Sequence, residues 1–170
     1  MDAILLRRSV RKFNDKLIPY DDLITLCRYG EAAPTAKNQR SREYIIIENK
    51  ELILKIAEIF KNSTMQVKEA KQMIAVIGKD LNSLKAPLFA VQDLSLATEN
   101  IMIKACEMGI GSVMLGTYPM EERYLKANEL LNLEDNKFVF TFICLGYPKE
   151  DNAFYDKEKF NLDMVKYIGE

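Results

Sequence analysis

The arginines close to the amino terminus are the first residues whose type and spacing could do chemistry. Arg7, Arg8 and Arg11 lie within five residues of one another, together with Ser9. An arginine side chain can bind phosphate oxygens through two parallel hydrogen bonds, and a serine hydroxyl adds a further donor. The grouping favours an anion site, while a solvated basic turn that makes surface ion pairs has the same composition.

Composition excludes several other kinds of catalysis. The chain has no histidine, which removes Ser-His-Asp and Cys-His nucleophiles, histidine-ligated zinc and a histidine base. Cys27, Cys106 and Cys144 lie far apart without a C-x-x-C pair, so core positions suit them better than a disulfide framework or a thiolate metal site. A bound cofactor is the simplest remaining carrier of chemistry, because the protein then supplies binding, orientation and electrostatics.

Length and charge indicate one domain, 1–170, that acts on a small molecule. The chain is 48% hydrophobic and 29% charged, and its net charge of -1 offers no basic field for nucleic acid or an anionic membrane. No apolar run approaches the roughly 18 residues that span a bilayer. The apolar stretch Ala3 to Leu6 precedes the arginines, the reverse of signal-peptide order. We expect a cytoplasmic protein.

Apolar spacing and turn residues predict alternating helices and strands. The continuous run from Tyr44 to Ile47 indicates a strand covered on both faces. Gly109 suits the end of the longest helix, and Ala97 and Ala105 on one face of that helix would let a neighbouring helix or a partner subunit approach closely. After a short opening helix, the expected helices span about 19–32, 52–60 and 88–108, with a short one opening at Pro119, and the strands span 44–47, 73–78, 112–115 and 138–145.

The carboxyl-terminal segment is too apolar for a solvated tail, yet it follows no helical period. Docking on its own chain and docking across a dimer are equally compatible with the sequence. The apolar residues in question are Phe154, Tyr155, Phe160, Leu162, Val165, Tyr167 and Ile168.

Three separate motifs, in this order, resemble those of the nitroreductase family, and together they cover most of the chain. The resemblance implies an α+β, three-layer fold in which a central mixed or antiparallel sheet is flanked by helices. It also implies a homodimer with FMN in a cleft between the subunits, and a carboxyl-terminal extension, 151–170, that docks on the partner. The motifs are Leu5–Phe13 with Ile18-Pro19 and Ala33–Gln39, then Ala105–Ser112 with Leu115-Gly116, and finally Leu145–Pro148.

The resemblance gives the basic segment a division of roles. Its residues match positions that hold the phosphate, the ribityl chain and the pyrimidine edge of FMN. Arg7 and Arg8 suit the phosphate side, with Ser9 next to them, while Arg11 would lie near flavin N1 and O2. A cation there stabilises the negative charge that arrives with hydride, so Arg11 would tune the flavin's potential.

A second group of matched residues would reach FMN from the other subunit. Pro34, Thr35, Ala36 and Asn38 match the family's loop, although an ordinary turn after a helix would look the same. Many members continue with Gln-Pro-Trp, whereas this chain continues with Gln39-Arg40-Ser41-Arg42. The resemblance therefore leaves the shape of the cleft beside the loop open.

Further matches are less specific. Met114, Leu115 and Gly116 match a segment whose backbone lies beside the flavin ring, where an amide would bond N5; a purely structural turn is the alternative. Gln66 could reach the polar edge of the flavin. Lys159 matches a basic residue on the phosphate, and a solvated charged turn fits it equally well. The short stretch from Lys79 to Asp93 would leave the active site open.

The expected activity is ping-pong transfer of hydride from NADH or NADPH, through flavin N5, to a small acceptor such as a nitroaromatic or a quinone. No side chain need act as a catalytic nucleophile or base, and no metal is expected. Specialised family reactions, namely dehalogenation or flavin breakdown, are alternatives within the family. A flavin-binding protein without turnover is the alternative from another class.

Overall fold

The computed structural model describes residues 2–60, 64–79, 81–157 and 160–169, with side chains for all of these except residues 64–66. Its centre is a four-stranded sheet in the order β1-β2-β4-β3. Each neighbouring pair of these strands is antiparallel, so the sheet is antiparallel rather than mixed. The strands are β1 (Arg42–Ile47), β2 (Gln72–Lys79), β3 (Gly111–Gly116) and β4 (Lys137–Gly146).

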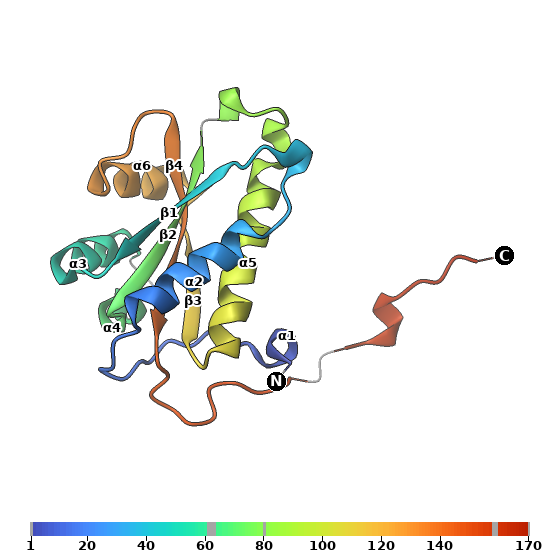
Figure 1. The fold of residues 1–170 in the computed structure, drawn as a ribbon, viewed down its shortest axis with the longest axis horizontal. Coiled ribbons are helices and arrows are strands. Elements are labelled where there is room, and N and C mark those ends of the chain that lie inside the picture. The colour runs from blue at the N-terminus through green and yellow to red at the C-terminus, as the bar shows by residue number, and fades with distance from the viewer. Residues whose placement is uncertain (1, 61–63, 80, 158–159, 170) are drawn as a thin grey trace.

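Helices cover both faces of this sheet (Figure 1). One hydrophobic cluster joins the sheet to α3, α4 and α6, and a second joins it to α2 and α5. The expected three-layer α+β fold is therefore confirmed. In the part of the chain that the structure describes, no helix is both long enough and apolar enough to cross a membrane. The helices are α1 (Ala3–Leu6), α2 (Tyr20–Glu31), α3 (Lys50–Ile59), α4 (Thr64–Glu69), α5 (Ala90–Glu107) and α6 (Glu121–Leu130).

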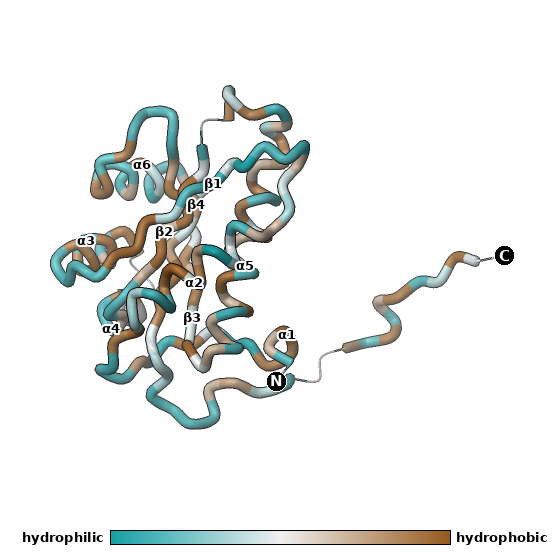
Figure 2. The backbone as a smooth tube through the Cα atoms, in the orientation of Figure 1, coloured by the Kyte–Doolittle hydropathy of each residue, from teal (hydrophilic) through white to brown (hydrophobic). Residues whose placement is uncertain are grey.

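Alternation along β4 divides the core between the two layers of helices. Phe142 belongs to the cluster under α3 and α6, whereas its neighbour Ile143 belongs to the cluster under α2 and α5. Successive strand residues point to opposite faces, so adjacent apolar residues serve two cores. Figure 2 shows hydrophobic residues along the central strands and hydrophilic residues over the outer loops.

Two differences from the predicted elements have physical reasons. The prediction that Tyr44–Ile47 is covered on both faces holds only in part: Ile45 and Ile47 pack against one core cluster and Tyr44 and Ile46 against the other, but residues 43–46 are only half-buried. Helix α4 was not predicted, since it is only one and a half turns long. Gly109 does end the long helix, with a φ of 72° that favours glycine.

The alanine face of α5 packs inside its own chain. Ala97 and Ala105 are fully buried, and Gly30 of α2 sits so near Ile101 that a Cβ there would come within 2.9 Å of the Ile101 side chain. The neighbour that approaches this face closely is therefore α2. A partner subunit is not needed to cover it.

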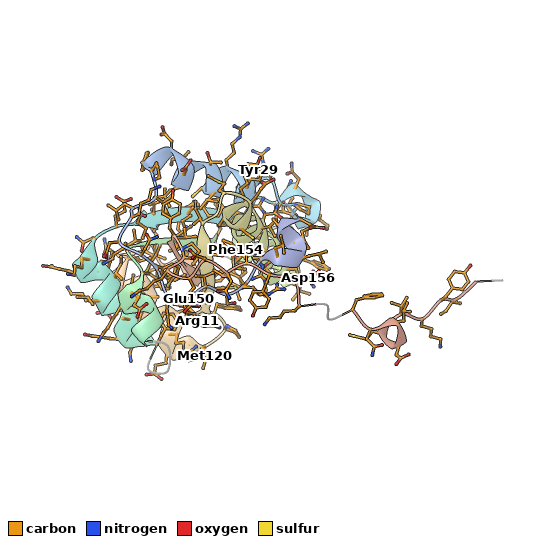
Figure 3. All side chains as sticks on the ribbon, turned by 90° about the horizontal axis from the view of Figure 1, so that it is seen from below. Arg11, Tyr29, Met120, Glu150, Phe154 and Asp156 are labelled. Carbon is orange, nitrogen blue, oxygen red and sulfur yellow. The ribbon has the colours of Figure 1, made fainter. Side chains whose placement is uncertain are left out.

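The carboxyl-terminal segment has two parts. From Tyr147 to Tyr155 it runs beside the amino-terminal segment, where the Tyr155 amide donates to the Leu6 carbonyl at 3.2 Å and the Lys149 amide donates to the Lys12 carbonyl at 3.1 Å. Residues 160–169, in contrast, are all exposed. They project from the body in both views of the chain (Figures 1 and 3). Docking on its own chain applies to the first part only.

Candidate functional site

The basic segment is held against the outer edge of β3. The Val10 amide donates to the Ser112 carbonyl at 2.9 Å. Two glycines allow this close approach: a Cβ on Gly111 would lie 2.7 Å from the Val10 side chain, and one on Gly146 would lie 2.8 Å from Phe13. Val10 and Phe13 are buried by this packing, whereas Ser9, Arg11 and Lys12 beside them are exposed.

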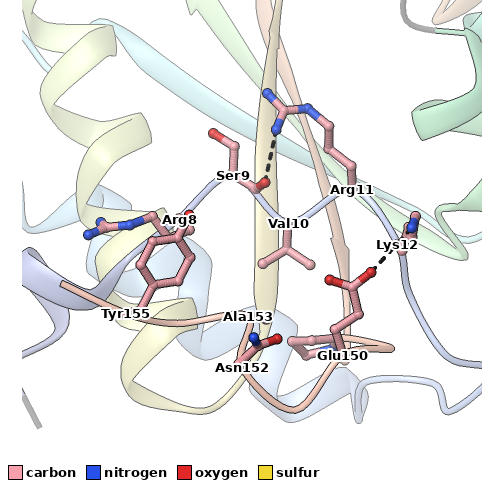
Figure 4. A pocket seen from close by; sticks show the side chains of 10 residues that line it. Arg8, Ser9, Val10, Arg11, Lys12, Glu150, Asn152, Ala153 and Tyr155 are labelled. Carbon is pink, nitrogen blue, oxygen red and sulfur yellow. Dashed lines mark hydrogen bonds and ion pairs between the residues drawn. The ribbon is translucent and has the colours of Figure 1, made fainter. Parts of the chain in front are cut away.

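A cavity of about 570 Å³ opens between this segment and the returning chain. That volume is within the usual range for small-molecule sites. Figure 4 shows the two walls, one from the basic segment and one from the segment after β4. Arg8, Ser9, Arg11 and Lys12 contribute to the first wall, and Glu150, Asn152 and Tyr155 to the second.

Arg8 and Tyr155 join the two walls. The Arg8 guanidinium lies over the Tyr155 ring, with 4.8 Å between Cζ and the ring centroid. Its Nη1 donates to the Arg7 carbonyl, while Nε is buried and has no hydrogen-bond partner among the described residues. The Lys157 ammonium lies 5.8 Å from the same ring. Two positive side chains therefore lie against one aromatic ring at this end of the cavity, a grouping that attracts an anion.

The cavity carries net positive charge. Among the described lining residues, Arg8, Arg11 and Lys12 supply three positive charges and Glu150 one negative charge, which leaves +2. Glu150 is already paired with Lys12 at 3.2 Å, in an exposed pair that contributes little to stability. Arg11 donates from Nη1 to the Ser9 carbonyl at 3.1 Å and is otherwise exposed. Figure 3 shows Arg11 and Glu150 on the face crossed by the returning chain.

Arg7 does not line this cavity. Its Nε donates to Glu99 of α5 at 2.8 Å, in a partly buried ion pair. Burial raises the pKa of the Cys106 thiol behind it, and the positive charges of Arg7 and Arg8 oppose that rise. The two arginines thus share one positive region, although only Arg8 faces the cavity.

The strand β3 presents backbone groups along its outer edge. The Ser112 carbonyl points outward to Val10, and alternation in an antiparallel strand turns the amides of Met114 and Gly116 the same way. Met114 is 47% exposed, whereas Leu115 is 6% exposed and packs into the core. Arg123 donates to the Gly116 carbonyl at 3.3 Å. Two of the three predicted residues are therefore accessible.

The Pro34–Asn38 loop lies at the other end of α5 from the cavity (Figure 1). The Ala36 amide bonds to Asp93 in the first turn of α5, whereas the basic segment lies against Ser112, just beyond the last turn. An α-helix of 18 residues is about 27 Å long. Within one chain, the Pro34–Asn38 loop and the basic segment are thus separated by about the length of α5.

Two predicted residues have no described side chain. Gln66 falls within α4, but its side chain lies outside the described part of the structure. Lys159 lies outside the described residues altogether. Tyr155 is not predicted as a site residue from sequence, and of the two neighbouring lysines the resemblance favours Lys159 over Lys157. The one sequence feature that points to Tyr155 is a lysine, Lys157, two positions after it in the segment that follows β4. No group of three or more potential metal-ligating side chains gathers among residues 2–60, 64–79, 81–157 and 160–169.

Comparison with known proteins gives a consistent family. The profile of the nitroreductase family matches residues 4–77 and 66–147. A protein of Archaeoglobus fulgidus that bears the provisional name NADH dehydrogenase/NAD(P)H nitroreductase is 35% identical over 166 residues, covering 97% of this chain and 95% of that protein.

Solved structures agree in fold. A protein of Clostridium acetobutylicum, provisionally named an NADH oxidase, superposes with a TM-score of 0.89 at 32% identity and covers 97% of this chain and 98% of that one. An FMN-dependent nitroreductase of Clostridium difficile superposes with a TM-score of 0.88 at 22% identity, covering 99% of this chain and 98% of that one. This chain belongs to the nitroreductase family.

Proposed function

We propose that the protein is an FMN-dependent oxidoreductase that passes hydride from NADH or NADPH to a small acceptor such as a nitroaromatic or a quinone. The observation that carries the proposal is the positively charged cavity beside the edge of β3, lined by Arg8, Ser9 and Arg11. The names of the related proteins support a redox role. No histidine is required for it.

The donors around the cavity fit the phosphate of FMN. Arg8 offers its guanidinium and Ser9 an exposed hydroxyl, and Lys157 lies 5.8 Å from the ring against which Arg8 is stacked. Charge-assisted hydrogen bonds to a phosphate are among the stronger polar contacts. Arg7 would join them by exchanging Glu99 for the phosphate.

The exposed residues further along the segment fit the ring. Arg11 would place a positive charge at the pyrimidine edge, and the outward amide of Gly116 would bond N5. When bound, FMN supplies the capacity to accept hydride from a nicotinamide and hand it on. The chain's own part is to hold the ring at the edge of β3 and to stabilise the negative charge that accompanies reduction.

The site would be completed by a second copy of the chain. The Pro34–Asn38 loop and the cavity lie at opposite ends of α5, so a two-fold related copy could bring the loop of one chain to the cavity of the other. Exposed apolar side chains near both ends of α5 support such an interface. They are Leu88 at 90% exposure, Phe89 at 49% and Leu96 at 47%, with Ile4 at 69% and Leu5 at 52% on α1.

The exposed segment 160–169 would dock on that partner. Leu162–Met164 form a single 3₁₀ turn between Asn161 and Val165, whose backbone angles are extended, and apolar residues recur along the segment (Figure 2). The edge of β1 is unpaired in the single chain, and an apolar groove lined by Ile24 of α2 and by Tyr44 and Ile46 of β1 runs beside it. Adding the partner's segment to this edge would satisfy the backbone groups of both.

The test uses the full-length protein without oxygen. Purified protein should be yellow, should bleach on addition of NADH or NADPH, and should regain colour when a quinone or a nitroaromatic is added. Protein that is yellow but does not bleach would instead be a flavin-binding protein without turnover. Bleached protein that neither acceptor reoxidises would point to a specialised reaction of the family.

A further inference from the structure

Asp93 in the first turn of α5 is buried at 3% exposure and accepts three hydrogen bonds from the loop that follows α2. Oδ1 accepts from the Ala36 amide at 2.9 Å. Oδ2 accepts from Gln39 Nε2 at 2.6 Å and from the Ser41 hydroxyl at 3.2 Å. One carboxylate therefore fixes three points along six residues of the loop.

The orientation of Gln39 makes an acceptor at position 93 necessary. The Ala86 amide donates to Gln39 Oε1 at 2.9 Å, and Gln39 Nε2 donates to the Ala86 carbonyl at 3.2 Å. This pairing directs the Gln39 amino group at Asp93. The Ala36 amide and the Gln39 amino group are both donors, and they face different oxygens of Asp93. An asparagine at position 93 has only one oxygen, so its own amino group would face one of these two N–H donors.

The loop that Asp93 holds has an unusual backbone. Lys37, Asn38 and Arg40 have φ values of 50°, 51° and 46°. Left-handed backbone is unfavourable for residues other than glycine and persists only where the surroundings enforce it. The three bonds to Asp93 lie between and beside these residues, and the Arg40 amide also donates to the Thr35 hydroxyl at 3.3 Å. Among the described residues, Asp93 is the one outside the loop that bonds to it at three points, so its bonds are suited to enforce this backbone.

The other end of the loop is held by Arg42, whose side chain is 1% exposed. Its Nη2 donates to the Glu31 and Ala33 carbonyls at 2.6 Å each. This chain thus holds the loop by buried polar contacts, which have a strict geometry.

We propose that Asp93 is a positioning residue that sets the conformation in which Asn38 is presented to the cofactor site of a second copy of this chain. The proposal rests on the proposed function, because that function gives the loop its ligand. Asp93 touches neither cofactor nor substrate and acts through the loop. A merely structural alternative is that its charge stabilises the start of α5.

The first measurement is tryptic cleavage of the full-length protein at Lys37 and Arg40, followed by mass spectrometry with FMN in excess. Both residues are exposed, so cleavage reports how firmly the loop is held. Asp93→Asn should accelerate it about tenfold, as expected for loss of a buried hydrogen bond to a charged group. Ser41→Ala, which removes the longest of the three bonds, is a milder variant and should give a smaller acceleration.

The matched control is Asp21→Asn. Asp21 is an exposed acid in the first turn of α2, so this variant loses the same charge at a helix start without touching the loop. It should leave the cleavage rate unchanged. Equal rates for Asp93→Asn, Ser41→Ala and the wild-type protein, with all three folded by circular dichroism, would overturn the proposal.

The second measurement is a double-mutant cycle on FMN affinity with Asp93→Asn and Asn38→Ala. If Asp93 acts through Asn38, each single variant weakens FMN binding about tenfold and the double variant is little worse than Asn38→Ala alone. Full additivity would contradict the positioning role. If Asn38→Ala leaves FMN affinity unchanged, the loop has no part in the proposed function. The cleavage rates would still decide whether Asp93 holds the loop.

Discussion

The guanidinium of Arg8 is stacked on the ring of Tyr155, with 4.8 Å between Cζ and the ring centroid. This contact joins the first residues of the chain to the segment that follows the last strand. The Tyr155 amide bonds to the Leu6 carbonyl beside it, at 3.2 Å. A cation that is held in place before a ligand arrives costs less conformational entropy on binding.

Tyr155→Ala should weaken FMN binding two- to fivefold, because a partly exposed cation–π contact is worth about 0.5–1 kcal/mol. Tyr155→Phe should bind FMN like the wild-type protein, since the ring rather than the hydroxyl contacts Arg8. Titration of FMN fluorescence measures both. A defect of equal size in the two variants would show that the ring is not what holds Arg8.

Arg7 and Arg11 should have separable roles. Arg7→Ala should weaken FMN retention about tenfold or more, as loss of a charge-assisted phosphate contact would. Arg11→Ala should retain FMN but lower its midpoint potential, because a positive charge beside the reduced ring is lost. Equilibrium dialysis and a potentiometric titration measure the two effects. Equal losses of affinity with unchanged potentials would contradict this division.

The elements of the fold could be predicted from sequence because their signals are local. The apolar run before Gly78 reads as a buried strand, and β2 is indeed buried along its length except at Lys79. Tyr44–Ile47 looks similar, yet β1 lies at the edge of the sheet and residues 43–46 are only half-buried. A strand's own residues do not show whether one strand or two pair with it.

The site could be predicted only in part. The structure brings Arg8, Ser9 and Arg11 to one wall of a cavity, and these residues can be proposed from sequence because their donors are adjacent. Tyr155 and Asp93 cannot, since each contacts a segment far away in the chain, and nothing in their own neighbourhoods shows which one. Arg7 was expected with Arg8, but the Glu99 carboxylate that draws it aside is supplied by another helix.

A chain that ends at residue 159 should be monomeric. The segment 160–169 is exposed and apolar, whereas Tyr155 and its contacts would remain in place. Analytical ultracentrifugation at matched concentrations should give a dimer for the full chain and a monomer for the shortened one. A shortened chain that stays a dimer and still binds FMN would refute the role of this segment.

Stability should fall as pH rises above about 9. Burial raises the pKa of Cys27 to about 11 and that of Cys144 to about 12, from an ordinary value of 9.0. Above pH 9 the unfolded chain therefore releases protons that the folded chain retains, so the stability fully present below pH 9 is progressively lost. The fully buried Cys144 contributes a slope of about 1.4 kcal/mol per pH unit in that window, and the partly exposed Cys27 contributes less.

Urea unfolding between pH 8 and pH 10.5 measures this loss. Cys27→Ala should reduce the slope by the contribution of one thiol, while the remaining titrating groups act equally in both proteins. Slopes that coincide in the wild-type and Cys27→Ala proteins would show that Cys27 is not desolvated.

The central claim is that the cavity beside Arg8 and Ser9 binds FMN, and the most direct measurement is the FMN content of the full-length protein. The wild-type chain, saturated with FMN and freed of excess, should release an equimolar amount on denaturation. Arg8→Ala, with its fold verified by circular dichroism, should release far less. A wild-type chain that retains no FMN, or an Arg8→Ala chain that retains as much as the wild-type protein, would contradict the account.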